Sequence, residues 1–267
     1  MAIIQVSLHG KRLGLSPEGY LTGDGFKGID TSPYGTTGQG FVVAPSPLEK
    51  SSIFDDFLAA VISPIWNLQK GSDGGATNYV INAQAGGVIR GVTGAGAGVS
   101  YAANAVQFEG GLNWLANKGG LLMEATVKPS IITTIAIFVG FTDKTTLEMP
   151  FTLSSGALTS NASDGCGFLF DTAATAATLK LVGVKANTDT TVQDTGVALS
   201  ASVFNRLRVD VDVTGQATFF LNGAQVGVAM PAATTITTAM IPIVAAFTRT
   251  AGSANIDIDY ILVQQNR

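Results

Sequence analysis

The strictest constraint on the fold comes from residues 204–228, where two kinds of strand signal lie side by side in the sequence. In Arg206–Val213 every odd position is apolar and every even position is charged. Successive side chains of a strand point to opposite faces, so this segment predicts a strand with one buried and one solvated face. Asn222-Gly223 then separates two apolar runs, and this dipeptide is typical of type I′ hairpin turns. With a turn at 214–216, the segment predicts a three-stranded antiparallel meander.

The remainder of the chain carries further strand signals and no long helical pattern. Leu122–Lys128 alternates between apolar and polar residues, whereas Ile135–Phe141 is apolar throughout and predicts a strand covered on both faces. The segment Ile53–Ile62 is compatible with a short helix or with the first strand. The expected fold class is all-β, a two-sheet antiparallel β-sandwich. Its other strands are expected at Tyr79–Ala83, Gly87–Val92, Ala105–Phe108, Phe168–Phe170, Leu179–Val184 and Ile256–Val263.

Residues 1–50 differ from the rest of the chain, because Gly and Pro recur there and apolar patches are short. We expect an extended N-terminal arm or attachment segment over residues 1–50 and the sandwich over residues 51–267, with Pro45-Ser46-Pro47 as the hinge. A disordered terminus is the alternative interpretation of the first segment. The arm residues expected to bind a partner are Ile3, Ile4, Val6, Leu8, Lys11, Arg12 and Leu13.

Charged residues make up 13% of the chain, against about 25% in an average soluble protein. So few charges predict that partner subunits cover much of the surface. The net charge of −4 offers no basic surface for nucleic acid. No membrane span is expected, because Asn222-Gly223 and Pro231 interrupt the long uncharged stretch between Asp212 and Arg249. The first residues are not expected to form a signal peptide, since no basic segment precedes an apolar one.

The sequence gives little support for a nucleophilic active site or a metal site. The single cysteine, Cys166, lies in an apolar run and excludes an intrachain disulfide, so we expect a small buried side chain rather than a reactive thiol. The single histidine, His9, lies in the arm, far in sequence from Cys166, which argues against a Ser-His-Asp or Cys-His site. Trp66 and Trp114 are flanked by apolar residues, and we expect both to be buried rather than to stack on a ligand.

The C-terminal segments are similar to a known fold family. Phe204–Asp212, Phe219–Gly223 and Ile258–Val263 resemble the closing strands of concanavalin A-like (laminin G-like) jelly rolls. The resemblance covers roughly residues 53–267 and is strongest after residue 200. It implies a jelly-roll sandwich, and it is less specific for function than for fold.

A narrower resemblance is to structural proteins encoded near the capsid genes of tailed bacteriophages. It rests on Ile137–Asp143, Asp164–Thr172 and the ending Gln264–Arg267. It implies a non-enzymatic virion protein of the head decoration (cement) or fibre type, made in the host cytoplasm and placed on the capsid surface. The expected partners are the major capsid protein, bound through the arm, and neighbouring copies in a homo-oligomer, with a trimer as the guess. The alternative is a fibre or lectin-like module that binds a host surface glycan.

Concanavalin A-like folds also include glycoside hydrolases, which need two carboxylates at the reacting bond. The five glutamates are never two or four positions apart, so no Glu-x-Asp-x-Glu strand motif exists. Asp210/Asp212 and Asp257/Asp259 have same-face spacing, and we interpret them as the solvated face of strands. The resemblance also implies that Asp259 lies at the terminal-strand position where some relatives place a calcium ligand, but no acidic loop in this sequence supports a calcium site. We therefore expect no catalytic residues, metal site or cofactor.

Overall fold

The computed structural model describes residues 50–82, 86–96 and 100–266, together with three short N-terminal strands. The chain divides into two compact units, Met1–Ser46 and Pro47–Arg267. In the first unit, β1 (Val6–Leu8) pairs antiparallel with β2 (Lys11–Leu15), and β2 pairs with β3 (Leu21–Thr22). The first pairing sets Val6 opposite Leu13 and Leu8 opposite Lys11. Ile3, Ile4 and His9 lie outside the described residues, and partner binding by the arm stays a prediction.

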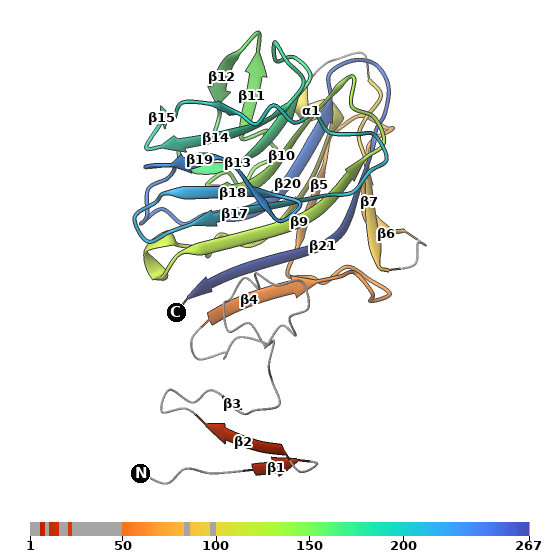
Figure 1. Cartoon of the computed structure of the whole chain (residues 1–267). Coiled ribbons are helices and arrows are strands. Elements are labelled where there is room, and N and C mark those ends of the chain that lie inside the picture. The colour runs from red at the N-terminus through yellow and green to blue at the C-terminus, as the bar shows by residue number, and fades with distance from the viewer. Residues whose placement is uncertain are drawn as a thin grey trace. The chain divides into compact units, whose positions relative to one another are not determined.

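The second unit is a sandwich of two antiparallel sheets (Figure 1). Sheet I has the order β15-β14-β13-β10-β20-β8-β5, with β16 also paired to β14. Sheet II has the order β19-β18-β17-β9-β21-β7-β6, with β4 also paired to β21. The elements are β4 (Lys50–Asp55), β5 (Asn67–Lys70), β6 (Thr77–Asn82), β7 (Val88–Val92), α1 (Tyr101–Asn104), β8 (Ala105–Glu109), a 3-10 helix (Ala116–Lys118), β9 (Leu121–Pro129), β10 (Ile135–Thr142), β11 (Phe151–Ser154), β12 (Ala157–Ser160), β13 (Gly165–Asp171), β14 (Leu179–Lys185), β15 (Thr188–Asp189), β16 (Gln193–Asp194), β17 (Asn205–Val211), β18 (Ala217–Leu221), β19 (Ala224–Met230), β20 (Ile241–Thr248) and β21 (Asn255–Asn266).

The predicted meander is confirmed as β17-β18-β19 of sheet II. Asn222 and Gly223 have φ values of 52° and 88°, which is the pair of positive angles that a type I′ turn requires. Leu207, Val209 and Val211 of β17 are buried, as the alternation predicts. Val213 departs from the pattern and is 51% exposed, because β17 ends before it.

Two apolar layers flank sheet I. The main core fills the space between the sheets, and Ile137, Val139 and Phe141 of β10 point into it. Phe138, on the opposite face of β10, packs in a second layer with residues of the β11–β12 hairpin, which covers the outer face of sheet I (Figure 1). The prediction that the Ile135–Phe141 strand is covered on both faces is therefore confirmed, although the covering hairpin was not expected.

The other local predictions have mixed outcomes. The segment Ile53–Ile62 begins as strand β4 and continues without a helix, which decides between the two alternatives. Cys166 is 0% exposed, and burial raises the pKa of its thiol to about 12, as expected of an inert core residue. Trp66 and Trp114 are both buried, as predicted. No helix in the described part of the chain is long and apolar enough to span a membrane.

Candidate functional site

The Asp210/Asp212 pair does not form a carboxylate site. Asp210 is half-buried, and desolvation raises its pKa to about 6 against the opposing effect of Arg208, whose Nη2 lies 3.1 Å from Asp210 Oδ2. Asp212 lies beyond β17, and its Oδ1 accepts hydrogen bonds from the backbone N–H groups of Thr214 and Gln216 at 2.8 and 3.0 Å. The prediction of a solvated strand face holds only in part for Asp210, whereas Asp212 is exposed as predicted but lies after β17, where it closes the turn between β17 and β18.

The prediction of a solvated face is also wrong for Asp257, whose side chain is 1% exposed. Arg90 of β7 and Lys128 of β9 stand directly opposite it on the neighbouring strands. Arg90 Nε and Nη2 lie 2.6 and 2.9 Å from its two carboxylate oxygens, and Lys128 Nζ lies 2.9 Å from Oδ2. Burial raises the pKa of the Asp257 carboxyl, but the hydrogen bonds from both cations outweigh burial and hold the pKa below its ordinary value. Asp257 is therefore part of a structural ion cluster.

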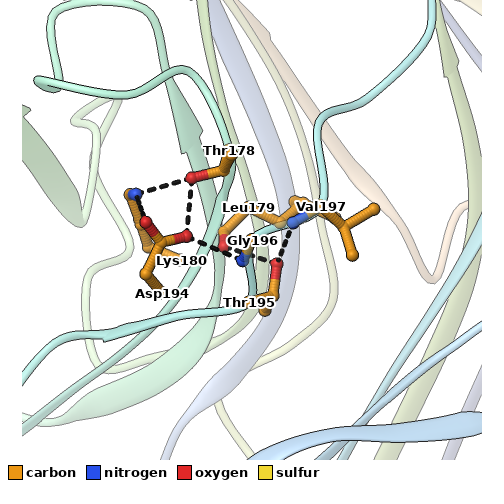
Figure 2. Close-up of polar contacts among 7 residues, drawn as sticks. All are labelled: Thr178, Leu179, Lys180, Asp194, Thr195, Gly196 and Val197. Carbon is orange, nitrogen blue, oxygen red and sulfur yellow. Dashed lines mark hydrogen bonds and ion pairs between the residues drawn. The ribbon is translucent and has the colours of Figure 1, made fainter.

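A second ion pair fastens the short strand β16 to β14 at the far edge of sheet I. Lys180 Nζ lies 2.6 Å from Asp194 Oδ2 and from Thr178 Oγ1, as Figure 2 shows. Asp194 Oδ1 also accepts hydrogen bonds from Thr178 Oγ1 and from the Gly196 backbone N–H. These donors, with Lys180 first, lower the pKa of Asp194 to about 2. These side chains hold one another in place, so we interpret the cluster as one that stabilises the sheet edge.

An open cleft of about 350 Å³ lies at the other end of sheet I, beside the edge strand β5. Three connections meet there: the segment before β5, the segment after β8 and the loop after β10. One acidic side chain, Glu109 at the end of β8, is among the lining residues. The full lining is Pro64, Ile65, Trp66, Asn67, Glu109, Gly110, Gly111, Leu112, Thr145 and Ile241.

Strand register explains why Glu109 is surrounded by amides. Val106 and Phe108 of β8 point into the main core, so Gln107 and Glu109 point to the outer face of sheet I. On β5, Asn67 pairs with Glu109 and Gln69 pairs with Gln107. Paired residues share a face, so the two strands place four amide and carboxylate side chains in one cross-strand cluster.

The Glu109 carboxylate is 3% exposed and accepts three amide hydrogen bonds. Asn67 Nδ2 and Gln69 Nε2 donate to Oε1 at 2.5 and 2.7 Å, and Gln107 Nε2 donates to Oε2 at 2.5 Å. Tyr101 fixes the orientation of Gln107, because its hydroxyl donates to Gln107 Oε1 at 2.8 Å. A carboxylate offers about four acceptor positions, so one position remains, on Oε2.

The loop after β10 contacts the cluster through two of its backbone carbonyl groups. Gln69 Nε2 donates to the Thr145 carbonyl at 3.3 Å, and Gln107 Nε2 donates to the Thr146 carbonyl at 3.4 Å. The β5 and β8 side chains therefore fix the position of the loop that borders the cleft.

Apolar and polar side chains are both exposed at the cleft. Ile65 and Leu112 are 50% and 45% exposed, and the polar residues Asn67 and Thr145 are exposed as well, whereas Trp66 is buried with its ring centroid 4.7 Å from that of Phe108. A Cβ atom on Gly110 would lie 2.8 Å from Pro242 Cγ, so only glycine lets the chain leave β8 at this point. The cleft therefore combines a buried carboxylate with both polar and apolar lining residues.

Sequence reasoning did not find this site. Glu109 was counted among the five glutamates, but its partners on β5 lie 40 and 42 residues away in sequence. The available signal was Gln107 and Glu109 at alternate positions of an otherwise apolar strand. Within the described residues, no group of three His, Cys, Asp or Glu side chains could hold a metal ion.

No protein-family model and no curated protein matches this sequence. Solved structures match most of the sandwich. The carbohydrate recognition domain of Emp47p is similar, with a TM-score of 0.55 and 13% identity over 82% of this chain and 98% of that domain. The Bacillus licheniformis β-glucanase is similar with a TM-score of 0.53 and 12% identity, over 79% of this chain and 97% of the glucanase. A protein of unknown function from Shewanella oneidensis MR-1 is similar with a TM-score of 0.50 and 14% identity, over 82% of this chain and 87% of that protein.

These likenesses establish the predicted fold, a concanavalin A-like jelly roll, and at such low identity they establish the fold alone. The same fold carries a sugar-recognition domain in one neighbour and a glucanase in another, so fold does not decide between binding and hydrolysis.

Proposed function

We propose that the β-sandwich is a non-enzymatic glycan-binding module and that the cleft at Glu109 is its sugar site. The proposal rests on one observation, a buried carboxylate that three amides hold in a cleft where the apolar side chains Ile65 and Leu112 are exposed. Sugars present both hydroxyl groups and C–H surfaces. A hydroxyl would donate to the remaining acceptor position of Glu109, while a C–H surface would pack on Ile65 and Leu112.

The lining favours binding over hydrolysis. Most glycosidases of either stereochemistry use two carboxylates that flank the scissile bond. Glu109 is the one acidic residue that lines this cleft. Three amides already engage its oxygens, which holds the carboxylate in place as a hydrogen-bond acceptor.

Replacing Glu109 with glutamine is expected to weaken sugar binding by about tenfold to a hundredfold. The side-chain NH2 group of glutamine would face the amide donors that now bond to the carboxylate, and one oxygen acceptor would be lost. Isothermal titration of the full chain with an oligosaccharide found in a glycan screen, with and without calcium, measures the change. Since Glu109 is buried, Leu112→Ser serves as a second cleft variant, and we expect a several-fold loss from it as well.

The matched control is Val228→Ser, which changes a 70% exposed side chain on β19. Its affinity should equal that of the unmodified protein. Equal affinity in all three variants would show that sugar binds elsewhere, and the proposal would then be wrong.

A second proposal concerns where the module is displayed. The separate compact unit Met1–Ser46 and the low charge content support a particle-bound protein, in which this unit attaches to a phage capsid through the major capsid protein. Extended arms suit such attachment because they add strands to exposed sheet edges. Many copies on a lattice then strengthen a weak contact through multivalency.

Deleting residues 1–46 is expected to abolish sedimentation with empty capsids while the thermal transition of the sandwich remains, because every described residue of the main core belongs to the second unit. The full chain and the deletion variant would be compared by co-sedimentation and calorimetry. A deletion variant that still binds capsids as the full chain does would contradict attachment through this unit.

A further inference from the structure

The turn that joins β18 to β19 contains the one Asn-Gly dipeptide of the sequence, Asn222-Gly223. Both residues are exposed, and both have positive φ angles. Glycine has no Cβ atom, so little shields its backbone nitrogen from the side chain of the preceding residue. Among the described residues, no acceptor takes the Gly223 N–H. The turn therefore places a small, accessible nitrogen next to the amide carbon of Asn222.

Arg206 of β17 lies against this turn and contacts the Asn222 amide group. The Arg206 backbone N–H donates to Asn222 Oδ1 at 2.9 Å, and the Asn222 N–H donates to the Arg206 carbonyl at 2.8 Å. A donor held on a carbonyl oxygen stabilises the negative charge that develops there when a nucleophile adds to the carbon. The guanidinium group is also close, because a Cβ atom on Gly223 would lie 2.6 Å from Arg206 Nη2.

We propose that Asn222 is a site of spontaneous deamidation, in which Gly223 supplies the nucleophile and Arg206 stabilises the tetrahedral intermediate. The Gly223 nitrogen bonds to Asn222 Cγ, the Cγ–Nδ2 bond breaks, and the side-chain nitrogen leaves as ammonia with the proton that the Gly223 nitrogen loses. Water then opens the cyclic imide at one of its two carbonyl carbons. Addition at Cγ gives aspartate, whereas addition at the backbone carbonyl carbon gives isoaspartate.

The fold favours aspartate over isoaspartate. Leu221 and Ala224 pair across the turn, and a two-residue type I′ turn between them requires a main chain of ordinary length. Isoaspartate adds the side-chain Cβ atom to the main chain and would break this turn. Aspartate keeps an oxygen that accepts the Arg206 N–H, and its negative charge would be attracted to the guanidinium group.

Asn187 provides a matched control within the same chain. It is exposed and has a φ of 62°, against 52° for Asn222, so the two asparagines share a backbone conformation and accessibility. The residue after it is Thr188, whose β-branched side chain hinders its backbone nitrogen. A difference in deamidation between the two asparagines therefore reports the effects of Gly223 and Arg206. Neither asparagine lines the cleft at Glu109, so this inference does not depend on the glycan proposal.

Peptide mapping by mass spectrometry, after incubation of the full chain at mildly alkaline pH, is the test. We expect the acid product to form at Asn222 at least about tenfold faster than at Asn187. Arg206→Ala should slow the reaction at Asn222 by about threefold, because it removes an exposed cation that stabilises the intermediate. Equal thermal transitions of this variant and the unmodified protein would confirm that both are folded.

The ratio of the two products tests the contribution of the turn. The ratio of aspartate to isoaspartate should be at least about threefold higher in the folded chain than in a synthetic peptide of residues 217–230, which lacks the β17 partner strand. The Asn222→Asp variant identifies the aspartate product in the map.

Any one of three results would overturn the proposal. Deamidation at Asn222 could be absent or no faster than at Asn187. Arg206→Ala could leave the rate at Asn222 unchanged, which would show that Arg206 does not stabilise the intermediate. The product ratio of the folded chain could equal that of the peptide, which would show that the turn does not select the product.

Discussion

Replacing Asp257 with alanine is expected to lower the free energy of unfolding by about 3 kcal/mol, because it leaves the cations Arg90 and Lys128 without their shared partner. Breaking a buried ion pair commonly costs about 3–5 kcal/mol. We expect a loss at the lower end of this range, because the Arg90 and Lys128 side chains are 32% and 18% exposed and water can partly solvate them. Urea denaturation of the variant and the unmodified protein measures the difference.

Asp259 provides the matched control two residues along the same strand. Desolvation, as the largest cause, and the nearby carboxylate of Asp56 raise the pKa of Asp259, so its ionised form gains nothing from folding. Asp259→Ala should therefore change the unfolding free energy by less than about 0.5 kcal/mol. Similar losses from Asp257→Ala and Asp259→Ala would contradict the ion cluster.

The ion cluster also predicts the direction of the acid response. The pKa of Asp257 is lower in the folded protein than in the unfolded chain, where it is about 3.9. Its stabilising contribution is therefore complete above the unfolded pKa and is lost as the pH falls through the folded pKa. Between about pH 5 and pH 2, the unfolding free energy of Asp257→Ala should fall less steeply than that of the unmodified protein.

Replacing Asp171 with alanine is expected to cost about 3–5 kcal/mol and to loosen the β11–β12 hairpin. Asp171 is 0% exposed, and its Oδ1 accepts a hydrogen bond from Arg249 Nε at 3.0 Å. Its Oδ2 accepts hydrogen bonds from Arg249 Nη2 and, at 2.8 Å, from the backbone N–H of Leu153 in β11. Alanine would leave this buried N–H and part of the Arg249 guanidinium without partners.

Two measurements separate local from global effects of this change. Denaturation gives the total loss, and hydrogen exchange over residues 151–160 reports opening of the hairpin. Asp189→Ala is the control, because Asp189 is exposed on β15 at the edge of the same sheet, and it should alter neither quantity by more than experimental error. Unchanged exchange in the hairpin of Asp171→Ala would show that Asp171 does not anchor β11.

Local sequence patterns predicted some strands well and others not at all. The β17–β18–β19 meander depends on neighbouring residues and on the Asn222-Gly223 turn, so alternation and turn chemistry were sufficient. Strand β20 lies in the centre of sheet I but was not predicted. It contains Pro242, and a proline normally argues against a central strand because it donates no ladder hydrogen bond. The carbonyl of Pro242 nevertheless accepts the Gly110 N–H at 2.9 Å, so only its donor is missing from the ladder.

The surroundings of the buried carboxylates were harder to predict than the strands because they depend on long-range register. Alternation places Asp257 on the outer face of sheet II, but its burial comes from Arg90, which lies 167 residues away in sequence. In the same way, Glu109 becomes the floor of a cleft only when β5 pairs with β8 in the observed register. No local periodicity in the sequence specifies which distant strands become neighbours.

According to the proposed function, the cleft at Glu109 holds a sugar. The most direct test is an experimental structure of the full chain with the tightest-binding oligosaccharide from a glycan screen. We expect one sugar ring in the cleft, with a hydroxyl oxygen within about 3 Å of a Glu109 carboxylate oxygen and its C–H surface on Leu112. A sugar bound at another surface, or no binding by any oligosaccharide at millimolar concentration, would contradict the claim.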